Sequence, residues 1–125
     1  LLTTLSNSSL LDHDSQLHAF SCENILSDSW RPHKKNPVIF DPFFARNAGL
    51  IIEDNNFYRV YQKPGFNKYG ESLGVSKIEE LNEDNYRENS EFEVSPDFFK
   101  DIKGTHTYNF SNGLLVLDFL KTSKK

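Results

Sequence analysis

The chain of 125 residues has the length of one domain, which usually spans about 100–200 residues. Its formal net charge is −4, and acidic and basic residues are mixed without a basic block, so we expect no nucleic-acid partner. The apolar runs are short, as at Leu114 to Leu117, so we expect no membrane-spanning helix, which needs about 20 apolar residues.

The first elements in chain order are short. Residues 1–15 are rich in Ser and Leu and predict a loop, a strand remnant or a short helix, loosely ordered in each case. Residues 16–22 alternate apolar and polar side chains, which predicts a strand, and residues 36–40 predict another strand that starts at Pro37.

A hairpin is the clearest prediction for the middle of the chain. Residues 48–52 form an apolar run, residues 53–56 are typical of a turn, and residues 57–62 form the returning strand. Pro64-Gly65 and Tyr69-Gly70 predict the loop that follows.

The segment after this loop has two interpretations. Residues 71–81 predict a strand that leads through a turn into a further strand. A helix over residues 77–88 is the alternative, because Ile78, Leu81 and Tyr86 roughly follow helical spacing. Several Asn and Asp residues in this stretch prefer turns, so we favour strand, turn and strand.

The last third predicts a helical turn and a second hairpin. Ser95 and Pro96 suit the cap and first position of a short helical turn over residues 95–101. Asn112-Gly113 between two β-rich runs predicts a tight hairpin, and residues 121–125 are expected to be loosely ordered. The strands and turn signals together predict an all-β fold, as a sandwich, a barrel or a propeller.

Catalytic motifs are absent from the sequence, and the four histidines have no metal-ligand spacing. We therefore expect no metal and no cofactor, and Cys22, the single cysteine, excludes an internal disulfide. The carboxylates cannot be paired from sequence alone, so catalytic residues stay unassigned and enzymatic activity stays open. The compartment also stays open, with cytoplasm as the favoured interpretation.

Polar side chains within the predicted strands are the candidate binding residues. Buried Arg and Gln need partners, and Arg is well shaped to bind carboxylates or vicinal hydroxyl groups. The structural alternative is an internal salt bridge that joins neighbouring sheets. The candidate substrate-binding residues are Arg46, Arg59, Gln62 and His106.

One motif, W-x-x-H-x-x-N-P-V, resembles a sequence motif of five-bladed β-propellers that act on sugars. These propellers include arabinanase-like and fructosidase-like glycosidases. In this chain the motif comprises Trp30, His33, Asn36, Pro37 and Val38. The resemblance implies that Trp30, His33 and Asn36 order the crossing from one blade to the next.

Further motifs follow in a fixed order: Ala45-Arg46-Asn47-Ala48-Gly49, Tyr58-Arg59 with Gln62, Tyr69-Gly70, Ile78-x-x-Leu81, Tyr86-x-Glu88, Gly104-x-His106-Thr107 and Asp118. They resemble one group more closely: the propeller domain N-terminal to the transferase in glucosamine inositolphosphorylceramide transferases, and similar bacterial domains associated with formyltransferases. The resemblance spans roughly Leu17 to Asp118.

The resemblance implies a fold, a function and partners. Residues 1–125 would form a single β-rich domain or a fragment of a propeller, built from antiparallel four-stranded blades that correspond to the C-terminal blades. The implied function is to position a sugar substrate in a protein associated with a glycosidase or a glycosyltransferase, together with the remaining blades or a transferase domain. The alternative is a non-catalytic accessory or interaction domain attached to a transferase.

Overall fold

The computed structural model describes residues 1–5, 14–26, 28–65 and 68–121, and within these ranges the fold is all-β, as predicted, with antiparallel strands and no helix. The strands are β1 (Leu2–Thr4), β2 (Gln16–Ser21), β3 (Arg31–Pro32), β4 (Ile39–Phe40), β5 (Asn47–Glu53), β6 (Asn56–Gly65), β7 (Lys68–Leu81), β8 (Tyr86–Val94), β9 (Ile102–Gly104), β10 (Tyr108–Ser111), β11 (Leu114–Leu117) and β12 (Leu120–Lys121).

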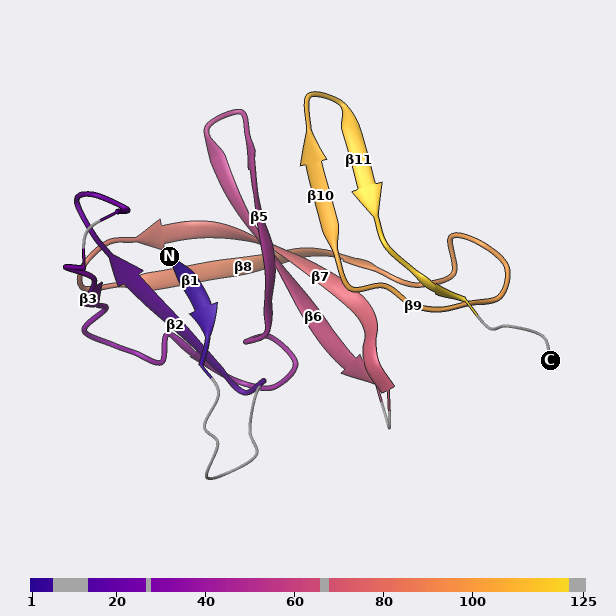
Figure 1. The fold of residues 1–125 in the computed structure, drawn as a ribbon, viewed down its shortest axis with the longest axis horizontal. Coiled ribbons are helices and arrows are strands. Elements are labelled where there is room, and N and C mark those ends of the chain that lie inside the picture. The colour runs from indigo at the N-terminus through magenta and orange to yellow at the C-terminus, as the bar shows by residue number, and fades with distance from the viewer. Residues whose placement is uncertain (6–13, 27, 66–67, 122–125) are drawn as a thin grey trace.

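A four-stranded sheet of β5, β6, β7 and β8, each antiparallel to the next, forms the centre of the molecule (Figure 1). The first predicted hairpin is confirmed as β5 and β6. Glu53 pairs with Asn56, so the loop is only Asp54 and Asn55, both in the left-handed region with φ of 48° and 61°. Such a two-residue turn matches the right-handed twist of the strands it joins.

The connection between β7 and β8 confirms strand, turn and strand over the helical alternative. The Asn82 side-chain oxygen accepts hydrogen bonds from the backbone N–H groups of Asp84 and Asn85, at 2.9 and 2.8 Å. The Asn82 N–H donates to the Asn85 carbonyl at 3.0 Å. These short-range bonds replace the backbone bonds that a helix would need.

Two local predictions are wrong. Pro64-Gly65 and Tyr69-Gly70 lie inside β6 and β7 and not in a loop, because a bulge between Lys63 and Gly65 accommodates the proline, which has no N–H to donate. Residues 95–101 form turns and bends and no helix. Asp101 has a φ of 68°, so the chain leaves the helical region before β9 begins.

An N-terminal sheet packs on one side of the central sheet. β2 pairs with β1, β3 and β4, which confirms the strand predicted at residues 16–22. The strand predicted at residues 36–40 is reduced to β4, and Asn36-Pro37 is a cis peptide ahead of it. The loose order expected for residues 1–15 and 121–125 falls in part on residues 6–13 and 122–125, outside the described ranges.

The hydrophobic core lies between the central sheet and the C-terminal hairpin. Ile51, Val60, Leu73 and Val75 are buried together, and Tyr108 and Phe110 of β10 pack against them. These side chains share one face because residues two apart along a strand point the same way. Each buried aliphatic side chain of this kind stabilises the fold by about 1.5–3 kcal/mol.

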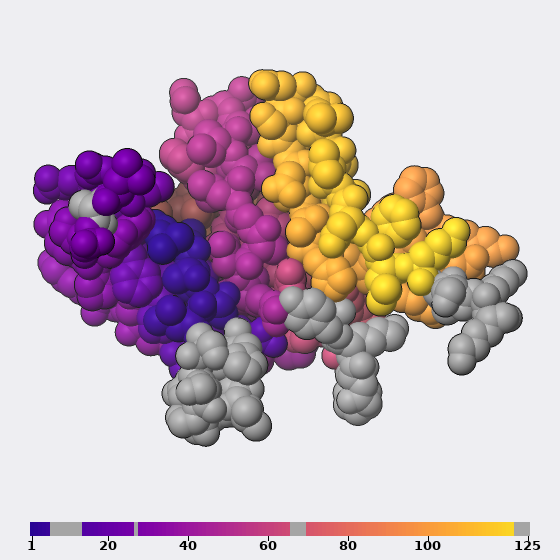
Figure 2. Space-filling model, viewed as in Figure 1, coloured from indigo at the N-terminus to yellow at the C-terminus, as the bar shows by residue number. Residues whose placement is uncertain are grey.

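The C-terminal part consists of two small sheets, β10 with β11 and β9 with β12. The second predicted hairpin is confirmed: Asn112 and Gly113 form its turn with φ of 52° and 76°. The outer strand leaves apolar side chains at the surface of the molecule, where Figure 2 shows β11 in yellow. The exposed ones are Leu114, Leu115, Val116, Phe119 and Leu120.

Candidate functional site

Arg59 is the most deeply buried charged residue among those that the structure describes, with 0% of its side chain exposed. Its Nε and Nη2 atoms donate to the two carboxylate oxygens of Glu88, at 2.7 and 2.5 Å. Nη2 also donates to the Phe44 carbonyl at 2.7 Å. A buried charge is tolerated only when it is paired and hydrogen-bonded, and this two-point contact supplies both conditions.

The strand register explains how Arg59 reaches Glu88 across an intervening strand. Arg59 on β6 lies opposite Ser76 on β7, which lies opposite Ser90 on β8. Ser76 is small and buried, so the guanidinium group extends over it toward Glu88. The contact therefore joins β6 and β8 within one sheet.

Tyr86 and Glu88 are two residues apart on β8 and so share a face, where the Tyr86 hydroxyl donates to Glu88 Oε2. Burial and the charge of Glu88 raise the pKa of Tyr86, so its hydroxyl keeps its proton at neutral pH. Burial alone would lower the pKa of Arg59, but its hydrogen bonds and attraction to Glu88 outweigh burial and raise it. Both shifts favour a charged Arg59 and a protonated Tyr86 hydroxyl.

The Tyr61 ring packs between the Arg59 guanidinium group and the backbone at Gly74. The Arg59 guanidinium carbon lies 4.9 Å from the centre of the Tyr61 ring, a cation–π contact. The ring lies against Gly74, where an added Cβ would stand 2.1 Å from Tyr61 Cζ. Only glycine leaves room for the ring at this position.

A cavity of about 390 Å³ opens next to this network. Its polar lining comes from Asp41, Ser76, Tyr86, Arg87, Glu88 and Ser90, and its apolar lining from Val38, Ile39 and Phe44. The Asp41 carboxylate accepts the backbone N–H of Phe43 at 2.8 Å, which shapes the turn that carries Phe44. The cavity thus lies between β8 and residues 38–44.

Gln62 and His106 meet on the opposite side of the central sheet. Arg59 and Tyr61 point to one face of β6, whereas Val60 points to the core on the other face, as does every second residue. The Gln62 side-chain amide donates to the His106 carbonyl at 3.0 Å. Two of the four candidates therefore lie in one corner, formed by β6 and the segment before β10.

Asp118 holds the backbone of this corner. Its Oδ1 accepts the N–H groups of His106 and Thr107, both at 2.7 Å, and its Oδ2 lies 3.3 Å from His106 Nδ1. Partial burial alone would raise the pKa of Asp118, but these hydrogen bonds and the attraction of His106 outweigh it and lower the pKa.

Arg46 borders the same corner through its backbone, because its carbonyl accepts the Gln62 N–H at 2.9 Å. Its guanidinium group forms an ion pair with Asp14 and is 25% exposed. Sequence reasoning missed Asp14 and Glu88 as the partners of the two arginines. For Glu88 a signal was present, since the Tyr86-x-Glu88 spacing puts both side chains on one strand face.

Comparison with known proteins identifies the family. The family model for the N-terminal part of glucosamine inositolphosphorylceramide transferase 1 matches residues 1–120. The chain belongs to this family. Glucosamine inositolphosphorylceramide transferase 1 of Arabidopsis thaliana is 40% identical over 84 residues, which cover 65% of the chain and 10% of that relative. No solved structure matches the chain.

The family match confirms the resemblance carried by the motifs between Leu17 and Asp118. By this similarity the chain is a transferase-associated N-terminal domain. No helix among the described residues could span a membrane, and these residues contain no group of three or more His, Cys, Asp or Glu side chains arranged for a metal ion.

The motif residues His33 and Asn36 contact the N-terminal sheet at β2. The Asn36 side chain bonds the N–H and the carbonyl of Ala19, both at 2.9 Å, and His33 N–H donates to the same carbonyl. Trp30 is half-buried just before β3. The Asn36 side chain therefore forms the two backbone hydrogen bonds with Ala19 that a neighbouring strand would otherwise form.

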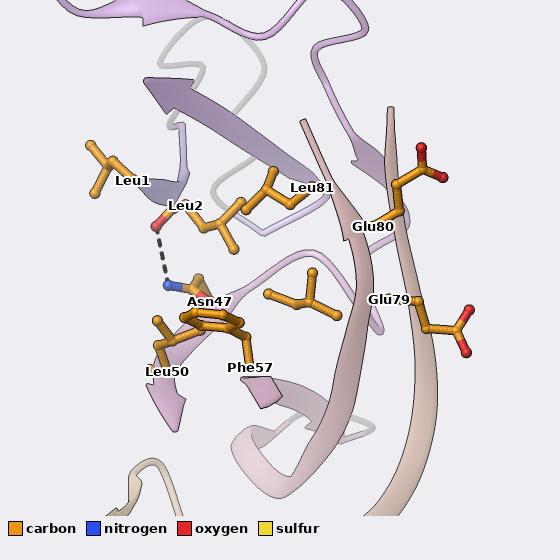
Figure 3. A pocket seen from close by; sticks show the side chains of 10 residues that line it. Leu1, Leu2, Asn47, Leu50, Phe57, Glu79, Glu80 and Leu81 are labelled. Carbon is orange, nitrogen blue, oxygen red and sulfur yellow. Dashed lines mark hydrogen bonds between the residues drawn. The ribbon is translucent and has the colours of Figure 1, made fainter. Parts of the chain in front are cut away.

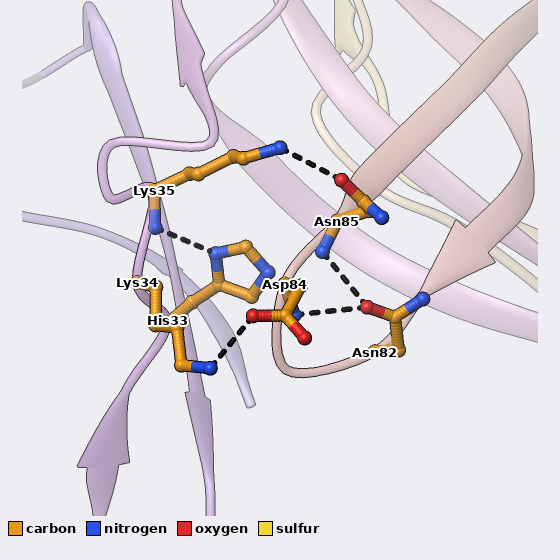
Figure 4. Close-up of polar contacts among 6 residues, drawn as sticks. All are labelled: His33, Lys34, Lys35, Asn82, Asp84 and Asn85. Carbon is orange, nitrogen blue, oxygen red and sulfur yellow. Dashed lines mark hydrogen bonds and ion pairs between the residues drawn. The ribbon is translucent and has the colours of Figure 1, made fainter.

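Two lysines of the same loop reach the turn between β7 and β8 (Figure 4). Lys34 Nζ lies 2.6 Å from Asp84, and Lys35 Nζ donates to the Asn85 side chain at 2.7 Å. A hydrogen bond and the charge of Asp84 raise the pKa of Lys34, and Lys34 in turn lowers the pKa of Asp84. The loop thereby contacts the tip of the central sheet.

An apolar groove of about 620 Å³ separates β1 from the central sheet (Figure 3). Leucine, isoleucine and phenylalanine side chains line most of it, and Asn47 crosses it with a hydrogen bond to the Leu2 carbonyl at 3.2 Å. The apolar lining residues are Leu1, Leu2, Leu50, Phe57, Ile78 and Leu81.

Proposed function

We propose that the chain contributes the C-terminal blades of a five-bladed β-propeller that positions a sugar substrate in a protein of the transferase family. The observation that carries this proposal is the family match over residues 1–120. The antiparallel β5–β8 sheet supports it, because a propeller blade is a sheet of four antiparallel strands. The remaining blades or a transferase domain would be its partners.

The candidate sugar contacts are Arg46, Gln62 and His106. They come from β6 and from the segments before β5 and before β10, and they offer donors and acceptors suited to hydroxyl or anionic groups of a sugar. Arg59 enters the proposal as a positioning residue, because its side chain is enclosed and acts through Glu88.

A titration with sugars tests the proposal. The relative's name contains glucosamine and inositol, so these two compounds and glucose serve as probes of the 125-residue chain by calorimetry. We expect saturable binding of at least one probe, weakened about tenfold in His106→Ala. His18→Ala on β2 is the matched control and keeps the affinity of the parent chain.

The outcome that overturns the proposal is the absence of saturable binding for all three sugars by a folded chain. Loss of binding in both histidine variants would refute the placement of the sugar at His106.

A second candidate function is that of an accessory interaction domain. The observation in its favour is the row of exposed apolar side chains on β11 and β12, a surface typical of protein contacts. The test is co-purification with the transferase segment of the Arabidopsis relative. This candidate predicts capture that Leu115→Lys abolishes, and its failure is capture that this variant leaves unchanged.

A further inference from the structure

The cavity beside Glu88 lies on the opposite face of the central sheet from Gln62 and His106. It holds about 390 Å³, at the lower end of the roughly 300–1,000 Å³ of small-molecule sites. This space suits a single ring-sized ligand and not an extended chain. Its lining combines hydroxyl and carboxylate groups on β7 and β8 with an apolar wall from residues 38–44.

Glu88 enters this cavity as a prearranged acceptor. Three donors hold its carboxylate: Nε and Nη2 of Arg59 and the hydroxyl of Tyr86. A carboxylate has roughly four acceptor positions, so one position stays available to a ligand hydroxyl or amino group. Because Arg59 and Tyr86 already fix the rotamer, the contact costs little side-chain entropy on binding.

The charges around the cavity select against anionic ligands. Asp41 and Glu88 contribute two carboxylates to the lining. The two nearby guanidinium groups are already paired, Arg59 with Glu88 and Arg87 with Glu79, the latter at 3.4 Å. Because each of these pairs is neutral as a whole, Asp41 supplies the net negative charge of the lining, which repels a phosphate and attracts an ammonium group.

We propose that this cavity binds one sugar unit that carries hydroxyl and amino groups, with Glu88 and Asp41 as acceptors and Ser90 as a hydroxyl contact. Phe44 and Ile39 face the carbon skeleton of the ring. The proposal rests on the proposed carbohydrate function but places the amino sugar at a different site from Arg46, Gln62 and His106.

The test is a titration of the isotopically labelled chain with glucosamine, followed by amide chemical shifts. We expect the largest shifts at residues 38–44 and 86–90. Ser90→Phe fills the cavity from an exposed position and weakens binding about tenfold. Asn89→Phe is the matched control on the same strand, with its side chain on the other face, and leaves the affinity unchanged. Glucosamine 6-phosphate binds about tenfold or more weakly than glucosamine.

Three outcomes overturn the inference. Glucosamine shifts confined to Gln62 and His106, unaffected by Ser90→Phe, refute this site but leave the proposed function standing. Equal or tighter binding of the phosphorylated sugar refutes the charge argument. Absence of shifts with glucosamine, glucose and inositol alike refutes the site and the proposed function together. Asp41→Asn keeps the oxygen that accepts the Phe43 N–H, and in a folded chain it weakens glucosamine binding if the site is correct.

Discussion

The two faces of the β5–β8 sheet treat polar side chains in different ways. On one face Arg59 is fully enclosed, and Glu88 and the Phe44 carbonyl bind it at short distances. On the other, Gln62 and His106 are half-buried at a corner, where Asp118 binds the backbone more than the side chain. Full burial makes the Arg59 partners obligatory, whereas Gln62 and His106 are only partly buried and keep some contact with water.

The two arginines repeat this contrast. Arg46 pairs with Asp14 while 25% of its side chain remains exposed, so water screens the pair. Arg59 has 0% exposure and its pair is not screened in this way. The same residue type is therefore fully enclosed at one position and partly exposed to solvent at the other.

The largest expected effect is the loss of Arg59. Arg59→Leu leaves Glu88 largely buried without its cation, and we expect a loss of about 3–5 kcal/mol in the free energy of unfolding, measured with urea. Arg87→Leu on β8 is the control: its side chain is 65% exposed, and the change should be within about 1 kcal/mol. Equal effects for the two variants would remove the distinction between buried and exposed pairs.

Gly74→Ala is expected to displace the Tyr61 ring, which packs against Arg59. The added methyl group would stand 2.1 Å from Tyr61 Cζ, and Tyr61 is 2% exposed and has little room to move. We expect destabilisation of about 1–3 kcal/mol by urea unfolding. A variant as stable as the parent chain would show that the Tyr61 ring does not occupy this position.

Asp118→Asn sharpens the comparison at the corner of Gln62 and His106. Because the pKa of Asp118 is lowered in the folded chain, its ionised form stabilises the fold above the ordinary value of 3.8. This contribution is lost as the pH falls through the lowered pKa. The parent chain should therefore exceed Asp118→Asn in melting temperature at about pH 7 and lose this advantage in acid, as the pH falls below 3.8 and through the lowered pKa.

A surface exchange, Asp97→Asn, serves as the control in the same melting experiments. A difference between the parent chain and Asp118→Asn that stays constant across this pH range would contradict the assignment.

The smallest expected effect lies outside both faces, in the turn of the β10–β11 hairpin. Gly113 has a φ of 76° with open space around it, so Gly113→Ala meets backbone strain and no clash. We expect a loss of about 1 kcal/mol, detected by urea unfolding. A larger loss than that of Gly74→Ala would reverse the order argued from the two sites.

Local chemistry made the hairpins predictable from the sequence. Asn112-Gly113 adopts left-handed conformations readily, and residues 53–56 contain the turn residues that β5 and β6 require. The loop predicted at Pro64 was wrong, because a bulge lets a strand continue through a proline. The helical turn predicted at residues 95–101 was also wrong, since a cap and a proline permit a helix but do not supply the contacts that stabilise one.

The candidate site was only partly predictable. The alternation of side chains along a strand is enough to predict that Arg59 and Gln62 lie on opposite faces of β6. The pairing of Arg59 with Glu88 depends on the register of three strands, which no local pattern specifies. The cavity depends on residues 38–44 crossing that face, a long-range arrangement that the sequence does not display.

A crystal structure of the chain grown with glucosamine would test the central claim most directly. The account predicts one sugar in the cavity beside Glu88, with an amino or hydroxyl group within hydrogen-bonding distance of Glu88 and Asp41 and with the Arg59–Glu88 contact intact. A sugar bound only at Gln62 and His106, with the cavity beside Glu88 filled by water, would contradict this site but leave the proposed function standing, and a folded chain with no sugar at either place would contradict both.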